Sequence, residues 1–133
     1  MRPKTASLRP DDCSPELAVV REQHEELMLL ADQLYTIVRA GKTNGAVSKL
    51  LHQIEQKALA HFKFEEGVIE RMGYAGLERH RTLHKWIATD IHDLWARSIT
   101  NNVAIEAAEF LRRWLQKHMD DEDSAWMAQY LSR

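Results

Sequence analysis

Residues 46–71 read AVSKLLHQIEQKALAHFKFEEGVIER and contain no proline. Apolar side chains return along this stretch at the spacing of one face of an α-helix. The positions on or near this stripe are Leu50, Ile54, Leu59, Phe62 and Ile69. The stretch is therefore predicted to form one long amphipathic helix, which ends at the segment Met72-Gly73-Tyr74.

Three more amphipathic segments flank this helix along the chain. The first is predicted to begin at Ser14-Pro15, a cap residue followed by proline, and to end at Gly41. The third is predicted to run from about Ala75 to Ser98. The fourth is predicted to run from Val103 to about Tyr130, with Thr100-Asn101-Asn102 offering its caps.

The glycine and proline content favours helices throughout the chain. The three prolines all lie within the first fifteen residues, so none interrupts a helix after Pro15. A chain of 133 residues is long enough for one domain with a hydrophobic core. We therefore predict an all-α fold, an antiparallel up-down-up-down four-helix bundle over residues 14–133, preceded by an N-terminal arm over residues 1–13.

Charge and cysteine content exclude several classes of partner. Lys and Arg total 18 against 20 for Asp and Glu, so no basic excess favours binding to nucleic acid. The single cysteine, Cys13, cannot form an internal disulfide, which fits a reducing compartment. No apolar run approaches the roughly 20 residues that a membrane span needs, and the N-terminus lacks the hydrophobic core of a signal peptide. A cytoplasmic protein without a membrane span is expected.

Histidines occur in each of the four predicted helices. His61 and Glu65 are four residues apart, as are His80 and His84, so each pair projects from one face of its helix. His24 lies in the first helix, roughly 15 residues before its turn, and the second helix reaches His61 at a similar distance after that turn. The same counting across the later turns puts the third and fourth helices' histidines at this depth. A single polar layer inside the bundle is predicted.

A buried layer of imidazoles and carboxylates requires compensation. Each unpaired group would cost several kcal/mol, and a metal ion is the natural partner. Imidazole and carboxylate donors without cysteine point away from structural zinc and toward iron, manganese or a similar ion of high coordination number. The number of donors exceeds what one ion normally takes.

These motifs resemble those of the hemerythrin family, in particular its bacterial members. The family pattern is a lone histidine on the first helix, H-F-x-x-E on the second, H-x-x-x-H on the third and H-x-x-x-x-D on the fourth. Here it reads REQHEEL, HFKFEE, HRTLH and HMDDED. The metal-ligand positions that match are His24, His61, Glu65, His80, His84, His118 and Asp123.

The resemblance implies a role for each matched residue. Three histidines, His80, His84 and His118, would bind one iron, and His24 and His61 would bind the other. The two carboxylates, together with a solvent-derived oxo or hydroxo group, would bridge two iron ions, and O₂ would bind reversibly at the iron with two histidines. Apolar residues expected to wall the oxygen pocket are Phe62, Leu27 and Trp114.

The last ligand position conflicts with ideal helix geometry. An α-helix places residues i and i+5 about 140° apart, so Glu122, at i+4 from His118, would be the simple choice. A single π-type turn within HMDDED would bring Asp123 round instead, and such turns are frequent at functional sites. Asp123 is predicted as the ligand, with Glu122 as the alternative.

The resemblance implies reversible dioxygen binding rather than catalysis. This could serve storage or carriage, or oxygen and redox sensing, for instance as the N-terminal sensory domain of a signalling protein with a covalently attached output domain such as a diguanylate cyclase. The alternative is a di-iron enzyme, peroxidase-like or ferroxidase-like, or an iron donor for repair. Ferritin-like oxidases use two E-x-x-H elements and mostly carboxylates, which disfavours that chemistry here. His52 and His92 lie outside the pattern and are predicted at the surface or in the core.

Overall fold

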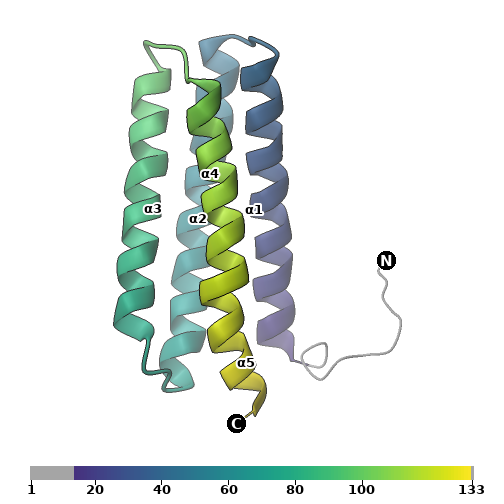
Figure 1. The fold of residues 1–133 in the computed structure, drawn as a ribbon, viewed down its shortest axis with the longest axis vertical. Helices are drawn as coiled ribbons and strands as arrows, with labels where there is room; N and C mark the ends of the chain where they lie inside the picture. The colour runs from purple at the N-terminus through teal and green to yellow at the C-terminus, as the bar shows by residue number, and fades with distance from the viewer. Residues whose placement is uncertain (1–13, 133) are drawn as a thin grey trace, which may run out of the picture.

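Four long helical segments run antiparallel to their neighbours in the computed structural model of the protein, which describes residues 14–132 (Figure 1). The first three are α1 (Pro15–Arg39), α2 (Asn44–Arg71) and α3 (Leu77–Ser98). The fourth consists of α4 (Ile105–Lys117), the π-helical turn η2 (His118–Asp123) and α5 (Ser124–Ser132), which follow one another without a loop. The predicted all-α up-down-up-down bundle is confirmed, whereas the arm predicted for residues 1–13 lies outside the described residues.

The predicted start of the first helix and the turn after it are found. The Ser14 hydroxyl accepts a hydrogen bond from the Leu17 amide at 3.3 Å, and Pro15 occupies the first helical position. Gly41 lies just beyond the helix with a φ of 70°, a left-handed conformation that glycine adopts without steric cost. The second helix begins at Asn44, slightly earlier than predicted, because the Thr43 hydroxyl caps it.

The last two helices begin two residues later than the predicted positions. The third begins at Leu77 rather than Ala75, after Gly76, and the fourth begins at Ile105 rather than Val103. Ala104 occupies the N-cap position of α4 in an extended conformation, and no side chain caps that helix. The polar segment 100–102 therefore belongs to the loop and does not supply the predicted cap.

The core consists of two apolar clusters at different heights in the bundle. The larger fills the end where α1 joins α2 and α3 joins α4, and it includes Leu27, Ile54 and Leu115. The smaller gathers round Trp126 at the other end. Leu59, predicted on the α2 stripe, is 47% exposed, because Ala58 occupies that turn's core position. No helix in the described part of the chain is long and apolar enough to cross a membrane.

Candidate metal centre

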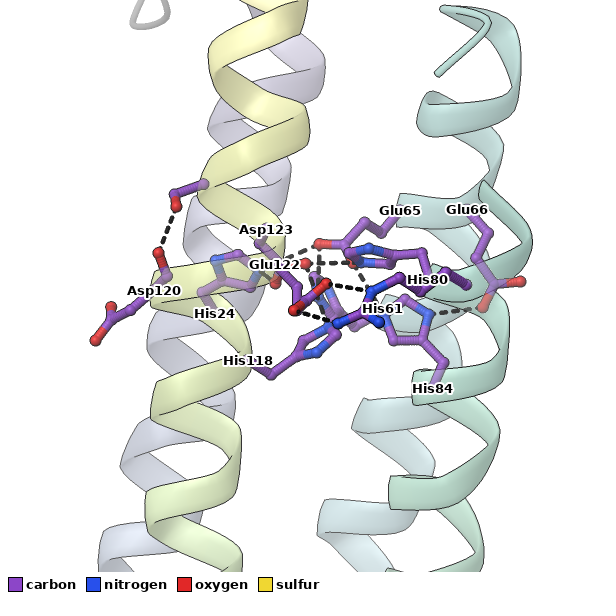
Figure 2. Close-up of polar contacts among 12 residues, drawn as sticks. His24, His61, Glu65, Glu66, His80, His84, His118, Asp120, Glu122 and Asp123 are labelled. Atoms are coloured by element: carbon purple, nitrogen blue, oxygen red, sulfur yellow. Dashed lines mark hydrogen bonds and ion pairs between the residues drawn. The ribbon is translucent and has the colours of Figure 1, made fainter. Parts of the chain in front are cut away.

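All the predicted metal ligands meet in one layer between the two apolar clusters (Figure 2). The layer draws His24 from α1, the H-F-x-x-E pair from α2, the H-x-x-x-H pair from α3, and His118 and Asp123 from η2. We call these residues the seven-residue cluster: His24, His61, Glu65, His80, His84, His118 and Asp123. Six of the side chains are buried, and His24 is 14% exposed. The depths counted along the sequence are therefore correct.

The two oxygens of Glu65 face different sets of histidines. Oε1 lies 3.0 Å from Nε2 of His80 and 3.0 Å from Nε2 of His84. Oε2 lies 3.3 Å from Nε2 of His24 and 3.3 Å from Nε2 of His61. One carboxylate thus stands between two imidazole groups and turns one oxygen toward each.

Asp123 divides its oxygens in the same way. Oδ1 lies 2.8 Å from Nε2 of His80 and 3.3 Å from Nε2 of His118, whereas Oδ2 lies 3.0 Å from Nε2 of His24. Two overlapping ligand groups result. We call them the three-histidine group (His80, His84, His118) and the two-histidine group (His24, His61), and both share Glu65 and Asp123.

The π turn η2 explains why Asp123 belongs to the cluster. It spans His118–Asp123, where the helix winds more widely than an α-helix, so that both end residues face the interior and are buried. Glu122 is instead 29% exposed and accepts hydrogen bonds from Arg79 at 3.0 and 3.2 Å. The Arg79 guanidinium also lowers the pKa of Glu122. The π turn is confirmed, and the structure places Asp123, not Glu122, among the other ligand candidates.

Hydrogen bonds outside the cluster determine which ring nitrogens face inward as acceptors. Nδ1 of His84 donates to Oε2 of Glu66 at 2.7 Å, because a carboxylate can only accept. With only one ring proton, held on Nδ1, the His84 ring would turn an Nε2 lone pair toward Oε1 of Glu65, at 3.0 Å, and these two acceptors would repel one another unless a proton or a metal ion lay between them. Among the described residues, Nε2 of His84, Nε2 of His118 and Oδ1 of Asp123 are buried without a hydrogen bond. A cation between these atoms would remove the repulsion and satisfy them together.

In the metal-free cluster, protons on some of the histidines supply part of the positive charge that the buried carboxylates need. Burial by itself lowers the pKa of His24, but hydrogen bonds with Asp123 and Glu65 outweigh it and raise the pKa to about 9. Burial likewise lowers the pKa of His80, but its contacts with the carboxylates of Asp123 and Glu65 outweigh burial and raise the pKa to about 9. Burial raises the pKa of Glu65, yet the surrounding histidines hold it well below its usual value. Burial and the Glu65 charge raise the pKa of Asp123, but His118, His24 and His80 lower it further, below its usual value. Both carboxylates are therefore ionised and available as ligands at neutral pH.

The donor set fits a pair of metal ions that accept nitrogen and oxygen. It offers imidazole nitrogens and carboxylate oxygens without sulfur, which suits iron or manganese better than a thiolate-bound structural zinc. Buried carboxylates in this arrangement also need compensating positive charge. The geometry therefore describes a cluster positioned for metal binding, with each carboxylate placed to reach two ions.

The aromatic residues expected to wall an oxygen pocket lie mainly against the three-histidine group. Phe62 stacks on His84 with ring centroids 4.0 Å apart, although it also lies 5.8 Å from the His61 ring. Trp114 stacks on His118 with centroids 5.1 Å apart. Leu27 is buried in the larger apolar cluster. Trp114 therefore lies beside the ligand group opposite to the one at which oxygen was expected.

Two residues that support the cluster were not predicted from the sequence. Glu66 accepts the hydrogen bond from His84, and Oε1 of Gln23 accepts one from Nδ1 of His61 at 2.7 Å. The available signal was position, since each directly adjoins a ligand in the sequence, at the depth of the cluster. His52 and His92 are exposed and outside the cluster, as one of the two predicted alternatives had it.

Comparison with known proteins agrees with the motifs. The family model of the hemerythrin HHE cation binding domain matches residues 16–130. The chain is similar to bacteriohemerythrin of Pseudomonas aeruginosa, at 25% identity over 88% of this chain and 76% of the relative. It is also similar to bacteriohemerythrins of Stenotrophomonas maltophilia, at 23% identity over 90% and 78%, and of Methylococcus capsulatus, at 22% over 79% and 81%. No solved structure gave a significant match. The chain belongs to the hemerythrin family.

Proposed function

We propose that this protein binds dioxygen reversibly at a pair of iron ions held by the seven-residue cluster. The observation that carries the proposal is the orientation of the two carboxylates. Glu65 and Asp123 each direct one oxygen to the three-histidine group and the other oxygen to the two-histidine group. A carboxylate so placed can bridge two ions. When bound, a ferrous pair supplies the two electrons that O₂ draws on binding, and recovers them when O₂ leaves.

The two ligand groups differ in their number of histidines, and this difference favours dioxygen binding at the ion held by the two-histidine group. The three-histidine group offers one more nitrogen than the two-histidine group, while the carboxylates are common to both. An ion held by His24 and His61 would therefore keep a position free for a small ligand. His24 is also the least buried member of the cluster, with 14% of its side chain exposed, so its side lies nearest to solvent.

The apolar clusters above and below the layer would keep the chemistry reversible. Leu27 and Ala58 on one side, and Val20 and Trp126 on the other, exclude water from the bundle interior. Exclusion of water slows proton delivery, which would otherwise let oxygen leave in a reduced form. The chain's own contribution is thus to hold the ions and to keep their surroundings dry.

This proposal favours a binding protein over an enzyme. The cluster has five imidazoles and two carboxylates, a histidine-rich set unlike the mainly carboxylate sites of ferritin-like oxidases. Storage, carriage and sensing all use the same reversible binding. An output domain in the same polypeptide would assign the binding to sensing, whereas rapid turnover of peroxide or ferrous iron would favour the enzyme.

A reversible oxygenation experiment tests the proposal. The iron-loaded protein is reduced without oxygen, exposed to O₂ and then returned to anaerobic buffer, while its visible spectrum is followed. A new visible band should appear with O₂ and fade on its removal, in the wild type and in the surface variant His92→Ala. The variants His61→Ala and Glu65→Ala should show no such band. Irreversible oxidation of the wild type within seconds would contradict the proposal.

A further inference from the structure

One histidine from each ligand group uses its outer ring nitrogen for a hydrogen bond to a residue outside the cluster. His84, of the three-histidine group, donates from Nδ1 to Oε2 of Glu66 at 2.7 Å, shown in Figure 2. His61, of the two-histidine group, donates from Nδ1 to Oε1 of Gln23, also at 2.7 Å. The two hydrogen bonds start from the same ring atom, Nδ1, and have the same length. They differ in charge, because one acceptor is a carboxylate and the other a neutral amide.

The charge on Glu66 is only partly balanced by its surroundings. Its other oxygen, Oε1, lies 3.6 Å from Nε of Arg81, beyond ordinary hydrogen-bond distance. Arg81 also lies 3.6 Å from Glu70 and 2.7 Å from Glu78, so one guanidinium serves three carboxylates. The Glu66 side chain is 24% exposed, so a substantial part of it is shielded from water. Its negative charge therefore acts on the His84 ring.

A carboxylate that accepts a hydrogen bond from an imidazole changes how strongly that imidazole donates electrons to a metal ion. It draws the Nδ1 proton toward itself and makes Nε2 more electron-rich, which raises the ligand's basicity. A charge-assisted hydrogen bond is roughly twice as strong as a neutral one, so Glu66 does this more than Gln23. A more basic ligand stabilises the more highly charged ferric ion over the ferrous ion, and hydrogen bonds to ligands are among the means by which proteins adjust reduction potentials.

We propose that Glu66 is a positioning residue that lowers the reduction potential of the iron bound by His84 below that of the iron bound by His61. The inference rests on the proposed iron pair. A diferric protein that takes one electron from an external reductant would then convert the two-histidine group's ion from ferric to ferrous, leaving the other ferric. The second electron would enter the three-histidine group at a lower potential. The two iron ions would thus differ in reduction potential before oxygen binds.

Neutralising Glu66 tests the inference. Glu66→Gln keeps the shape and the hydrogen-bond acceptor but removes the charge, and Gln23→Glu places a charge at the opposite group. Iron-loaded proteins are titrated with dithionite in the presence of redox mediators, and both one-electron midpoint potentials are measured by absorption and electron paramagnetic resonance. Glu66→Gln should raise the lower potential by an amount equivalent to about tenfold in the electron-transfer equilibrium, which is about 59 mV for one electron. Gln23→Glu should lower the higher potential and narrow the gap.

Glu70→Gln is the matched control. Glu70 lies as far from Arg81 as Glu66 does, at 3.6 Å, but its side chain is 64% exposed, whereas Glu66 is 24% exposed and accepts the hydrogen bond from His84. Its removal should leave both potentials within the error of the wild type. Equal shifts in Glu66→Gln and Glu70→Gln, or no shift in Glu66→Gln with two irons bound, would overturn the inference and leave the proposed function intact. A wild type that binds fewer than two irons would overturn both.

Discussion

Asp123 follows His118 by five residues, yet its Oδ1 atom lies 3.3 Å from Nε2 of that histidine, inside the buried layer. The π turn that spans them brings both side chains to the same face. A regular α-helix would have presented Glu122 instead, which here remains at the surface with Arg79. This local change in winding decides which acidic residue of HMDDED can reach the histidines.

Asp123→Ala should therefore abolish binding of an iron pair, whereas Glu122→Ala should retain it. The first change removes an oxygen from both ligand groups. The second removes an ion pair with the exposed Arg79, which contributes little to stability because solvent screens it. Elemental analysis after iron loading measures the outcome as iron per chain. Two irons in Asp123→Ala together with a loss in Glu122→Ala would reverse the assignment.

The stability of the metal-free protein should fall as the pH rises from 6.5 through about 9. The pKa values of His24 and His80 are raised from 6.5 to about 9 in the folded protein, so the folded state holds protons that the unfolded chain releases in this range. Their contribution is complete below pH 6.5 and is lost above about 9. Urea unfolding of the metal-free protein at several pH values measures this. A free energy of unfolding that increases over the interval would contradict it.

Iron uptake should show the opposite dependence on pH. An ion that binds His24 or His80 must displace the proton that each ring holds below about pH 9, so the apparent affinity for ferrous iron should increase from pH 6.5 toward 9. Protons should be released as iron binds in weakly buffered solution. His92→Ala, which removes an exposed histidine outside the cluster, should release as many protons as the wild type. Uptake without proton release would show that these rings are neutral beforehand.

The exposed position of Leu59 gives a prediction about stability. Ile54→Ala should destabilise the protein by about 2 to 5 kcal/mol, because Ile54 is fully buried in the larger apolar cluster. Leu59→Ala, on the same helix but 47% exposed, should change stability by about 0.5 kcal/mol or less. Thermal or urea unfolding of both variants distinguishes them. A similar loss in both would mean that Leu59 packs against something in solution.

Most of the fold could be predicted from the sequence because its signals are local. Ser14-Pro15 marks a helix start, and Gly41 and Gly73 lie where a left-handed conformation is needed, both with positive φ. The start of α4 could not be predicted in this way, because Ala104 carries no capping side chain. Periodicity also could not distinguish Leu59 from Ala58. Leucine is the more apolar of the two, but the helix phase puts the alanine inside.

The candidate site could be located from depth and motif, but its asymmetry could not. Counting residues from each turn places the histidines in one layer, since antiparallel helices rise at a constant rate. Counting says nothing about which oxygen of Glu65 faces His84 and which faces His61, as this depends on side-chain rotation. For the same reason, the hydrogen bonds from Glu66 and Gln23 emerged only from the structure.

A crystal structure of the iron-loaded protein, with anomalous scattering recorded at the iron edge, tests the two-metal assignment most directly. Two iron peaks per chain are expected in the polar layer. Glu65 and Asp123 should each bind one ion with one oxygen and the other ion with the second oxygen. A single peak, or a Glu65 carboxylate that binds one ion with both oxygens and leaves the two-histidine group empty, would contradict it.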